Sequence, residues 1–320
     1  MKCAAPVTKE YSSSAERLSR RELLRLALGA GALAFNGIAM AAESAESTLI
    51  RRPIPRTGEL LPVVGLGTWQ TFDVAESARA PLGRVLSEFV RLGGSVVDSS
   101  PMYGRSEGVV GDLAAALGLQ KKLFLATKVW TSGRQDGIRR MEESFRRLRT
   151  ERMDLMQIHN LVDWRAHLAT LRRWQDQGKV RFIGVTHYTE SAYDELARVL
   201  GTEDLDFVQL NYSIAERAAE RRLLPLAAKR RLAVLVNRPF AEGALFRKVR
   251  GKPLPPWAAE LGAASWAQFF LKFAISHPAV TCAIPATSKV EHLADNMQAG
   301  FGTLPDAATR ERMVRYVEDL

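Results

Sequence analysis

Four ionisable residues stand at or near the ends of short apolar runs in the sequence, where side chains from different segments can meet. Asp98, Lys128 and His159 each close such a run, and Tyr103 follows Asp98 by five residues. Each of these residues alone is most often a buried polar group whose hydrogen bonds are satisfied. Four of them arriving in order at the ends of consecutive apolar runs predict one shared reactive site.

The chemistry that suits this set is the reduction of a carbonyl group, which needs a hydride at carbon and a proton at oxygen. A free phenol has a pKa near 10 and is a poor acid at neutral pH. A neighbouring ammonium favours the phenolate, so we expect Lys128 to lower the pKa of Tyr103. Asp98 would hold Lys128 in a buried ion pair, and His159 would orient the carbonyl oxygen.

The segments that position these residues alternate between short β-branched runs and longer amphipathic ones, as in a parallel sheet covered on both faces. A turn at 57–59 joins two extended pieces, 50–55 and 60–62. The predicted strands are 63–66, 95–97, 123–127, 153–158, 180–185, 207–210, 233–236 and 280–284. The predicted helices are 75–92, 107–117, 137–148, 164–177, 191–200, 216–229, 265–276, 290–299 and 307–317.

Eight strand–helix units in one chain predict an α/β fold of the (β/α)8 TIM barrel type, in which active sites lie at the carboxyl ends of the strands. The alternative is a doubly wound sheet, which would carry a glycine fingerprint after its first strand. The segment Gly65–Gln70 lacks the third glycine of that fingerprint. The long connection 237–262 exceeds ordinary loop lengths and is predicted to form a lid over the barrel mouth.

The first 41 residues have the plan of an export signal. Arg20 and Arg21 precede a weakly apolar run, 26–42, that ends in a small-residue cleavage site, Ala39–Ala41. The run is too short and too rich in Ala and Gly for a good membrane span. Paired arginines before such a run resemble the twin-arginine (Tat) signal. The sequence thus predicts a signal peptide at 1–41, recognition by the Tat export machinery, a periplasmic location and a barrel domain at 42–320.

The composition of the chain argues against two further classes of protein, nucleic-acid-binding and metal-binding ones. The net charge is +10, and it becomes +7 without residues 1–41, which hold six basic and three acidic residues. The arginine pairs fall on predicted helix faces without a nucleic-acid motif, so we expect no nucleic-acid partner. Two cysteines and five histidines, without metal-ligand spacing, make a metal site improbable. Cys282, within the last predicted strand, is expected to be an inert core thiol.

Taken together, six segments resemble the aldo/keto reductase family, over about residues 54–299. They are GLGTW (65–69), VDSSPMYGRSE (97–107), LFLATKVW (123–130), MDLMQIHN (153–160), GVTHY (184–188) and IPATSKVEHLADN (284–296). The resemblance implies a barrel that binds NADP(H), in preference to NAD(H), across its mouth without a Rossmann domain. It also implies a catalytic tetrad of Asp98, Tyr103, Lys128 and His159, with Tyr103 as general acid.

The same resemblance implies where the cofactor would lie. The nicotinamide end would meet Gly67, Thr68 and Asp98, the pyrophosphate would lie under the start of the long connection 237–262, and the adenosine end would lie at the start of the last barrel helix. Further contacts are implied for Thr186, His187 and Gln209 at the carboxamide, Arg238, Pro239 and Phe240 at the pyrophosphate, and Thr287, Ser288 and Asn296 at the adenosine.

Several positions depart from the pattern of this family. Asn237 stands where an aromatic residue often stacks on the nicotinamide, and Thr186-His187 replaces Ser-Asn. Ala286 and His292 replace the basic residues of many NADP-specific members, and Lys289 could compensate for their loss.

The sequence therefore predicts a monomeric NAD(P)H-dependent oxidoreductase that reduces a small carbonyl substrate, with Trp69, Phe72 and Trp130 as walls of an apolar pocket. Two alternatives remain open. One is an exported barrel with a tightly bound nicotinamide cofactor that serves a periplasmic redox partner. The other is a non-catalytic nucleotide-sensing barrel.

Overall fold

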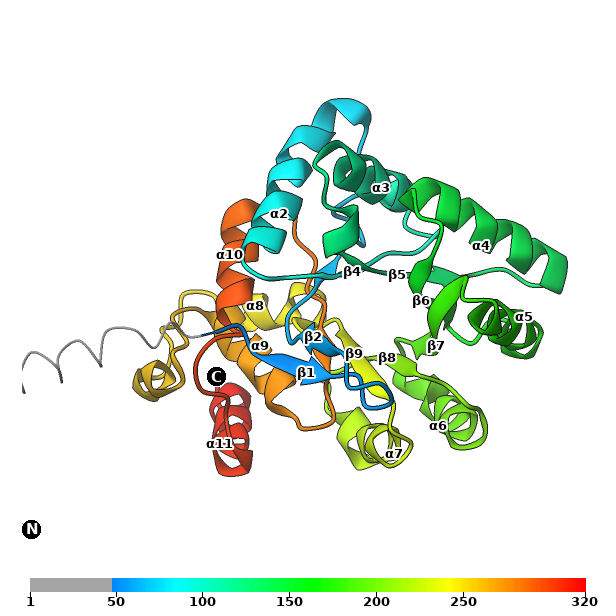
Figure 1. Cartoon of the computed structure of the whole chain (residues 1–320). Helices are drawn as coiled ribbons and strands as arrows, with labels where there is room; N and C mark the ends of the chain where they lie inside the picture. Colours follow the sequence, from blue (N-terminus) through cyan, green and yellow to red (C-terminus); the bar gives the residue numbers. More distant parts are fainter. Residues whose placement is uncertain (1–47) are drawn as a thin grey trace, which may run out of the picture. The chain divides into compact units, whose positions relative to one another are not determined.

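The computed structural model describes residues 48–320, which include one compact unit, Thr48–Leu320. The predicted twin-arginine signal lies outside these residues. The unit is built on eight parallel strands that follow one another in chain order around a single sheet (Figure 1). The strands are β3 (Leu66–Gly67), β4 (Val96–Asp98), β5 (Phe124–Val129), β6 (Met153–His159), β7 (Val180–His187), β8 (Phe207–Asn211), β9 (Ala233–Asn237) and β10 (Cys282–Ala283).

The sheet closes on itself. Val64 pairs with Ala283 and Gly67 pairs with Ala286, both in parallel, so the segment around β3 joins the one around β10. Gly67 is required at this seam, because a Cβ there would lie 2.6 Å from the carbonyl oxygen of Ile284. The predicted (β/α)8 barrel is confirmed.

Helices connect the strands and pack around the outside of the barrel (Figure 1). The helices bury apolar residues in the hydrophobic core, as the helical periodicity of the sequence requires. The α-helices are α2 (Arg79–Arg91), α3 (Ser106–Ala116), α4 (Arg134–Leu148), α5 (Trp164–Asp176), α6 (Tyr193–Thr202), α7 (Leu223–Lys229), α8 (Ala244–Lys248), α9 (Trp266–Ser276), α10 (Val290–Gln298) and α11 (Ala307–Glu318). Short 3-10 turns are η1 (Glu76–Ala78), η2 (Gln120–Lys122), η3 (Glu190–Ala192), η4 (Ala218–Arg221), η5 (Ala241–Gly243) and η6 (Pro256–Leu261).

The end of the barrel where the strands begin is closed by a hairpin. Strands β1 (Arg51–Pro53) and β2 (Leu60–Pro62) pair in antiparallel fashion around the predicted turn. The hairpin delivers Ile54 and Leu61, both fully or almost fully buried, into the apolar cluster inside the barrel. This cluster includes the first residues of several strands, such as Phe124 and Phe207. The opposite end, where the strands finish, is therefore the open one.

Two predicted elements differ from the observed ones. The predicted helix 216–229 is split into η4 and α7. Pro225 falls in the first turn of α7, and a proline in a helix interior would break the hydrogen bonds of a continuous helix. The connection 237–262 is only partly a lid. Its first half, up to Phe246, lines the barrel mouth, whereas Trp257 in its second half packs on Phe269 and Tyr316.

Candidate active site

The mouth of the barrel contains a cavity of about 720 Å³ at the carboxyl ends of the strands. Three residues of the predicted tetrad, Asp98, Tyr103 and His159, line its wall. The fourth, Lys128, lies buried beside Asp98. The apolar wall residues are Trp69, Met102, Trp130, Phe240 and Phe246.

A buried ion pair lies at the centre of the site. Lys128 Nζ is 2.6 Å from Asp98 Oδ2 and donates a second hydrogen bond, of 2.7 Å, to the carbonyl oxygen of Ser99. The other oxygen of Asp98 accepts hydrogen bonds from Gln157 Nε2 at 3.2 Å and Gln209 Nε2 at 2.9 Å. Burial, the largest single influence, lowers the pKa of Lys128, but the charge and hydrogen bond of Asp98 together with those of Tyr103 outweigh it and raise that pKa. Lys128 is therefore held as an ammonium ion.

Tyr103 lies against this ammonium. Lys128 Nζ is 5.0 Å from the centroid of the Tyr103 ring. Burial raises the pKa of Tyr103, and the positive charge of Lys128 only opposes that rise. Lys128 thus acts on the pKa of Tyr103 in the expected direction, but the net shift is upward rather than downward, because desolvation of the phenolate is the larger effect. The phenol keeps its proton at neutral pH and can donate it.

His159 completes the group as a neutral ring. Its centroid is 6.0 Å from that of Tyr103 in an edge-on arrangement. Burial, with a contribution from the charge of Lys128, lowers the pKa of His159 to about 2. His159 Nδ1 lies 3.1 Å from Ser100 Oγ, which itself accepts from the backbone N–H of Met102. When the Ser100 hydroxyl donates to Nδ1, the ring proton stays on Nε2 and is available to a ligand oxygen.

Of the three residues predicted to form walls of the substrate pocket, two line the cavity and one does not. Trp69 and Trp130 line the cavity, with 42% and 45% of their surfaces exposed. Phe72 is fully buried in the hydrophobic core and does not line the cavity, so the prediction for Phe72 is wrong. The chain turns after Thr68, where Phe72 N donates to Thr68 O, and this turn directs the phenyl ring inward.

Eight of the predicted cofactor residues line the cavity, and four do not. The four that do not are His187, Thr287, Ser288 and Asn296. His187 Nδ1 accepts a hydrogen bond from the backbone N–H of Thr189. Asn296 is buried in α10, and the cavity wall stops at Ala286, just before Thr287 and Ser288. Those that line the cavity are Gly67, Thr68, Asp98, Thr186, Gln209, Arg238, Pro239 and Phe240.

Some of the eight are already engaged by protein groups, Gln209 and Arg238 among them. Gln209 donates to Asp98, as described above, rather than leaving its whole amide free for a ligand. Arg238 is paired with Glu216 at 3.2 Å and with Glu242 at 3.3 Å. Both carboxylates therefore neutralise a guanidinium that was predicted to face the pyrophosphate.

The cavity fits a nicotinamide ring with its carboxamide. Asn237 Oδ1, at the end of β9, is buried in the cavity wall without a hydrogen-bond partner among residues 48–320. An amide N–H from a ligand would satisfy this acceptor. Gly67 and Gly243 leave the wall free of side chains on either side. The residues present are therefore compatible with a nicotinamide nucleotide.

Ser100 and Gln157 were not singled out in the sequence. Gln157 precedes His159 by two residues on β6, so both side chains point to the same face of the strand. Ser100 lies in the VDSSPMY segment, in the loop that follows β4. Strand periodicity identifies Gln157 as inward-facing, whereas the bond from Ser100 depends on a loop conformation that no pattern specifies.

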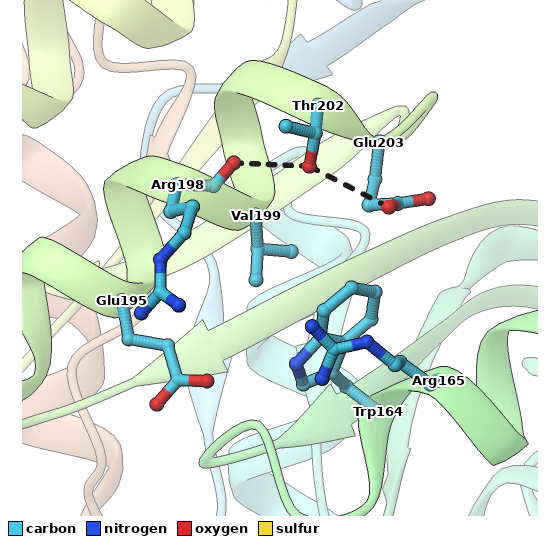
Figure 2. Close-up of a pocket in the computed structure, with 7 residues that line it drawn as sticks. All are labelled: Trp164, Arg165, Glu195, Arg198, Val199, Thr202 and Glu203. Atoms are coloured by element: carbon cyan, nitrogen blue, oxygen red, sulfur yellow. Dashed lines mark hydrogen bonds between the residues drawn. The ribbon is translucent and has the colours of Figure 1, made fainter.

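A second, smaller cavity of about 270 Å³ lies away from the strand ends, between α5 and α6 (Figure 2). There the Arg165 guanidinium carbon is 4.2 Å from the centroid of the Trp164 ring. Thr202 Oγ1 donates to the carbonyl oxygen of Arg198 at 3.1 Å. These groups bond to one another and contribute nothing to the barrel mouth.

Two further features are not found in the described part of the chain. Within 48–320, no group of three or more His, Cys, Asp or Glu side chains is placed to hold a metal ion. In the same part of the chain, no helix is long and apolar enough to cross a membrane. As predicted, Cys282 is a buried free thiol, and burial raises its pKa.

Fold and site thus define a barrel oxidoreductase with a Tyr, Lys, Asp and His centre. A sequence profile described as "Aldo/keto reductase family" matches residues 63–311. The methylglyoxal reductase YeaE of Escherichia coli is 31% identical over 243 residues, which cover 74% of this chain and 84% of that protein. The chain belongs to the aldo/keto reductase family, whose chemistry is NAD(P)H-dependent reduction of carbonyl groups.

Two further relatives bear on the cofactor. An aldo/keto reductase of Klebsiella pneumoniae, solved in complex with NADP and acetate, has 25% identity and a TM-score of 0.69 and covers 81% of this chain and 93% of its own. An NADH-specific methylglyoxal reductase of E. coli is 27% identical over 230 residues, or 60% of this chain and 68% of that protein.

Proposed function

We propose that this protein uses NADPH to reduce small 2-oxoaldehydes, such as methylglyoxal, to the corresponding alcohols. The observation that carries the proposal is the buried Asp98–Lys128 pair with its ammonium 5.0 Å from the centroid of the Tyr103 ring. The substrate class is supported by the similarity to a methylglyoxal reductase and by the apolar walls Trp69 and Trp130.

Each residue of the tetrad has its own role in the proposed reduction. NADPH, when bound, supplies the hydride that goes to the carbonyl carbon. Tyr103 gives its phenolic proton to the carbonyl oxygen, and Lys128 stabilises the phenolate that remains. Asp98 keeps Lys128 charged. His159, neutral with its proton on Nε2, donates a hydrogen bond to the same carbonyl oxygen and orients it.

The preference for NADPH over NADH is supported by the NADP complex of the Klebsiella relative and by Lys289 at the start of α10. The Lys289 side chain is exposed and available to a 2′-phosphate. Titrating both nucleotides by tryptophan fluorescence tests this. We expect tighter binding of NADPH, and Lys289→Gln should weaken NADPH binding while leaving NADH binding unchanged. Equal affinities in the wild type would refute the preference.

The role of Tyr103 is tested by Tyr103→Phe, which removes one hydroxyl from an otherwise similar ring. We expect turnover of methylglyoxal to fall by about 10²–10⁴-fold. Binding of NADPH should persist, because Lys128 and Asp98 remain. Turnover at the wild-type rate would show that another group is the acid.

We also propose that the protein acts in the periplasm as a monomer after export through the Tat machinery. The support is the Arg20-Arg21 pair ahead of the weakly apolar run. Replacing both arginines by lysine should hold the precursor in the cytoplasm, which fractionation and immunoblotting would detect. Continued export of the doubly substituted protein would rule out the twin-arginine signal. Size-exclusion chromatography with light scattering tests the monomer.

A further inference from the structure

Three residues of the mouth cavity carry buried oxygen atoms without hydrogen-bond partners among residues 48–320: Thr71 Oγ1, Asn160 Oδ1 and Asn237 Oδ1. A buried acceptor left unpaired costs free energy, so each position points to a ligand atom that completes it. The hydroxyl of Thr71 can rotate toward different partners and is the least informative of the three. Asn237 lies where the nicotinamide fits. Asn160 remains, and it directly follows His159 in the chain.

Asn160 lies in the cavity wall next to His159 and in the same wall as Trp130. The residue lies in the turn after β6, where Val162 N donates to His159 O. The neighbouring wall is aromatic, since the Trp130 and His159 ring centroids are 6.4 Å apart. A primary amide offers one acceptor and one donor group from a single side chain. Asn160 thus places a hydrogen-bonding group beside the residue that orients the carbonyl oxygen.

We infer that Asn160 is a specificity-determining residue that binds a second oxygen on the carbon next to the reacting carbonyl. A hydroxyl at that carbon donates to Asn160 Oδ1, and a keto oxygen accepts from Asn160 Nδ2. The inference rests on the proposed reduction of 2-oxoaldehydes and adds to it the residue that selects them over simple alkanals, together with 2-hydroxy aldehydes as a second substrate class. A site built to hydrogen-bond a substrate group discriminates against analogues that lack it.

A conformational explanation of Asn160 must be separated from this one. Its backbone is left-handed, with a φ of 53°, and asparagine tolerates that conformation better than most residues. Asn160→Gly is the matched control, because glycine adopts the same backbone freely but has no amide. Asn160→Asp keeps the acceptor and removes the donor. Together the two variants separate the backbone requirement from the amide, and the acceptor from the donor.

The experiment compares kcat/KM for three three-carbon aldehydes: propanal, 2-hydroxypropanal and 2-oxopropanal. Their intrinsic reactivities differ, so the measured quantity is each oxygenated aldehyde's ratio to propanal, compared between wild type and variant. We expect Asn160→Gly to lower both ratios about tenfold. Asn160→Asp should keep the 2-hydroxypropanal ratio and lose the 2-oxopropanal ratio. Unchanged ratios in Asn160→Gly would overturn the inference, and loss of both ratios in Asn160→Asp would overturn the acceptor role of Oδ1.

A binding measurement tests the inference without turnover. The fluorescence of the two cavity tryptophans, Trp69 and Trp130, should report binding of the product analogues 1,2-propanediol and 1-propanol. We expect the wild type to prefer the diol and Asn160→Gly to bind both alcohols equally. A wild type that reduces none of the aldehydes yet prefers the diol would contradict the proposed function and support the role of Asn160. A wild type that reduces all three aldehydes yet binds both alcohols equally would support the proposed function and contradict the role of Asn160.

Discussion

The polar groups at the two ends of the barrel differ in whether they are paired. At the closed end, Arg181 pairs with Asp154 at 2.6 Å and also with Glu59, and its guanidinium lies 5.0 Å from the centroid of the Phe182 ring. At the open end, the cavity wall keeps oxygen atoms of Asn160 and Asn237 unpaired. Unpaired buried groups persist in proteins where a ligand completes them. The closed end is therefore built for stability, and the open end gives up stability for binding.

The largest effect is expected from breaking the buried pair at the mouth with Lys128→Met. The carboxylate of Asp98 would lose its ammonium partner in a site where its exposed fraction is 2%. We expect the free energy of unfolding to fall by about 3–5 kcal/mol and turnover to be lost. Denaturant unfolding and NADPH oxidation measure the two effects.

The double variant Lys128→Met/Asp98→Asn provides the control for this prediction. It removes both charges together, so we expect it to recover most of the stability but none of the activity. A Lys128→Met protein as stable as the wild type would contradict the buried ion pair. Recovery of activity in the double variant would contradict the role of Lys128 in catalysis.

At the closed end, Leu61→Ala should affect stability alone. Leu61 is 2% exposed inside the barrel cluster, and its truncation should lower the free energy of unfolding by about 2–5 kcal/mol. We expect kcat/KM at 25 °C to stay within about twofold of the wild type, because the hairpin contributes nothing to the cavity wall. The neighbouring Leu60 is 55% exposed, so Leu60→Ala serves as the control and should be nearly neutral. A loss of activity in Leu61→Ala would mean that the two ends are coupled.

The same contrast explains how far the sequence could predict the structure. The strand ends that carry Asp98, Lys128 and His159 follow from apolar runs, because parallel strands end on the same side of a barrel. Gln157 was missed because its hydrogen bond to Asp98 crosses strands. The register that places Lys128 beside Gln157 is set by tertiary packing.

The two errors at the site have the same origin. The inward turn of Phe72 depends on a loop conformation rather than on a periodic pattern. The direction of the Tyr103 pKa depends on a balance between burial and the charge of Lys128, and residue types alone do not contain that balance. The export signal and the outer cofactor contacts, such as Ser288, stay predictions.

A smaller effect on stability is expected from lowering the pH, because His159 at the mouth is neutral in the folded protein. The pKa of His159 is about 2, against an ordinary value of 6.5. Below pH 6.5 the unfolded chain takes up a proton at this residue and the folded protein does not. Stability should therefore fall as the pH decreases from 6.5 to 4.5, by about 1.4 kcal/mol per pH unit from this residue, or about 3 kcal/mol over this range.

Denaturant unfolding of the wild type and His159→Gln between pH 4.5 and 7.5 measures this contribution, and the variant should have the flatter profile. His277, whose backbone carbonyl accepts from Arg52 of the hairpin, provides the comparison at the closed end. Its pKa is lowered to about 4, chiefly by burial, so its contribution should stop near that pH. Parallel profiles for the wild type and His159→Gln would show that His159 is protonated in the folded protein.

The smallest effect is expected at the closed end, from Glu59→Gln. Glu59 pairs with Arg181, but both side chains are partly exposed to solvent, and Arg181 keeps its bond to Asp154. Such a pair contributes about 0–1 kcal/mol and is screened by salt. We expect a small decrease in the free energy of unfolding at low ionic strength that disappears in about 0.5 M salt. A loss as large as that of Lys128→Met would mean that the closed end depends on its charges as the mouth does, and the contrast between the two ends would then fail.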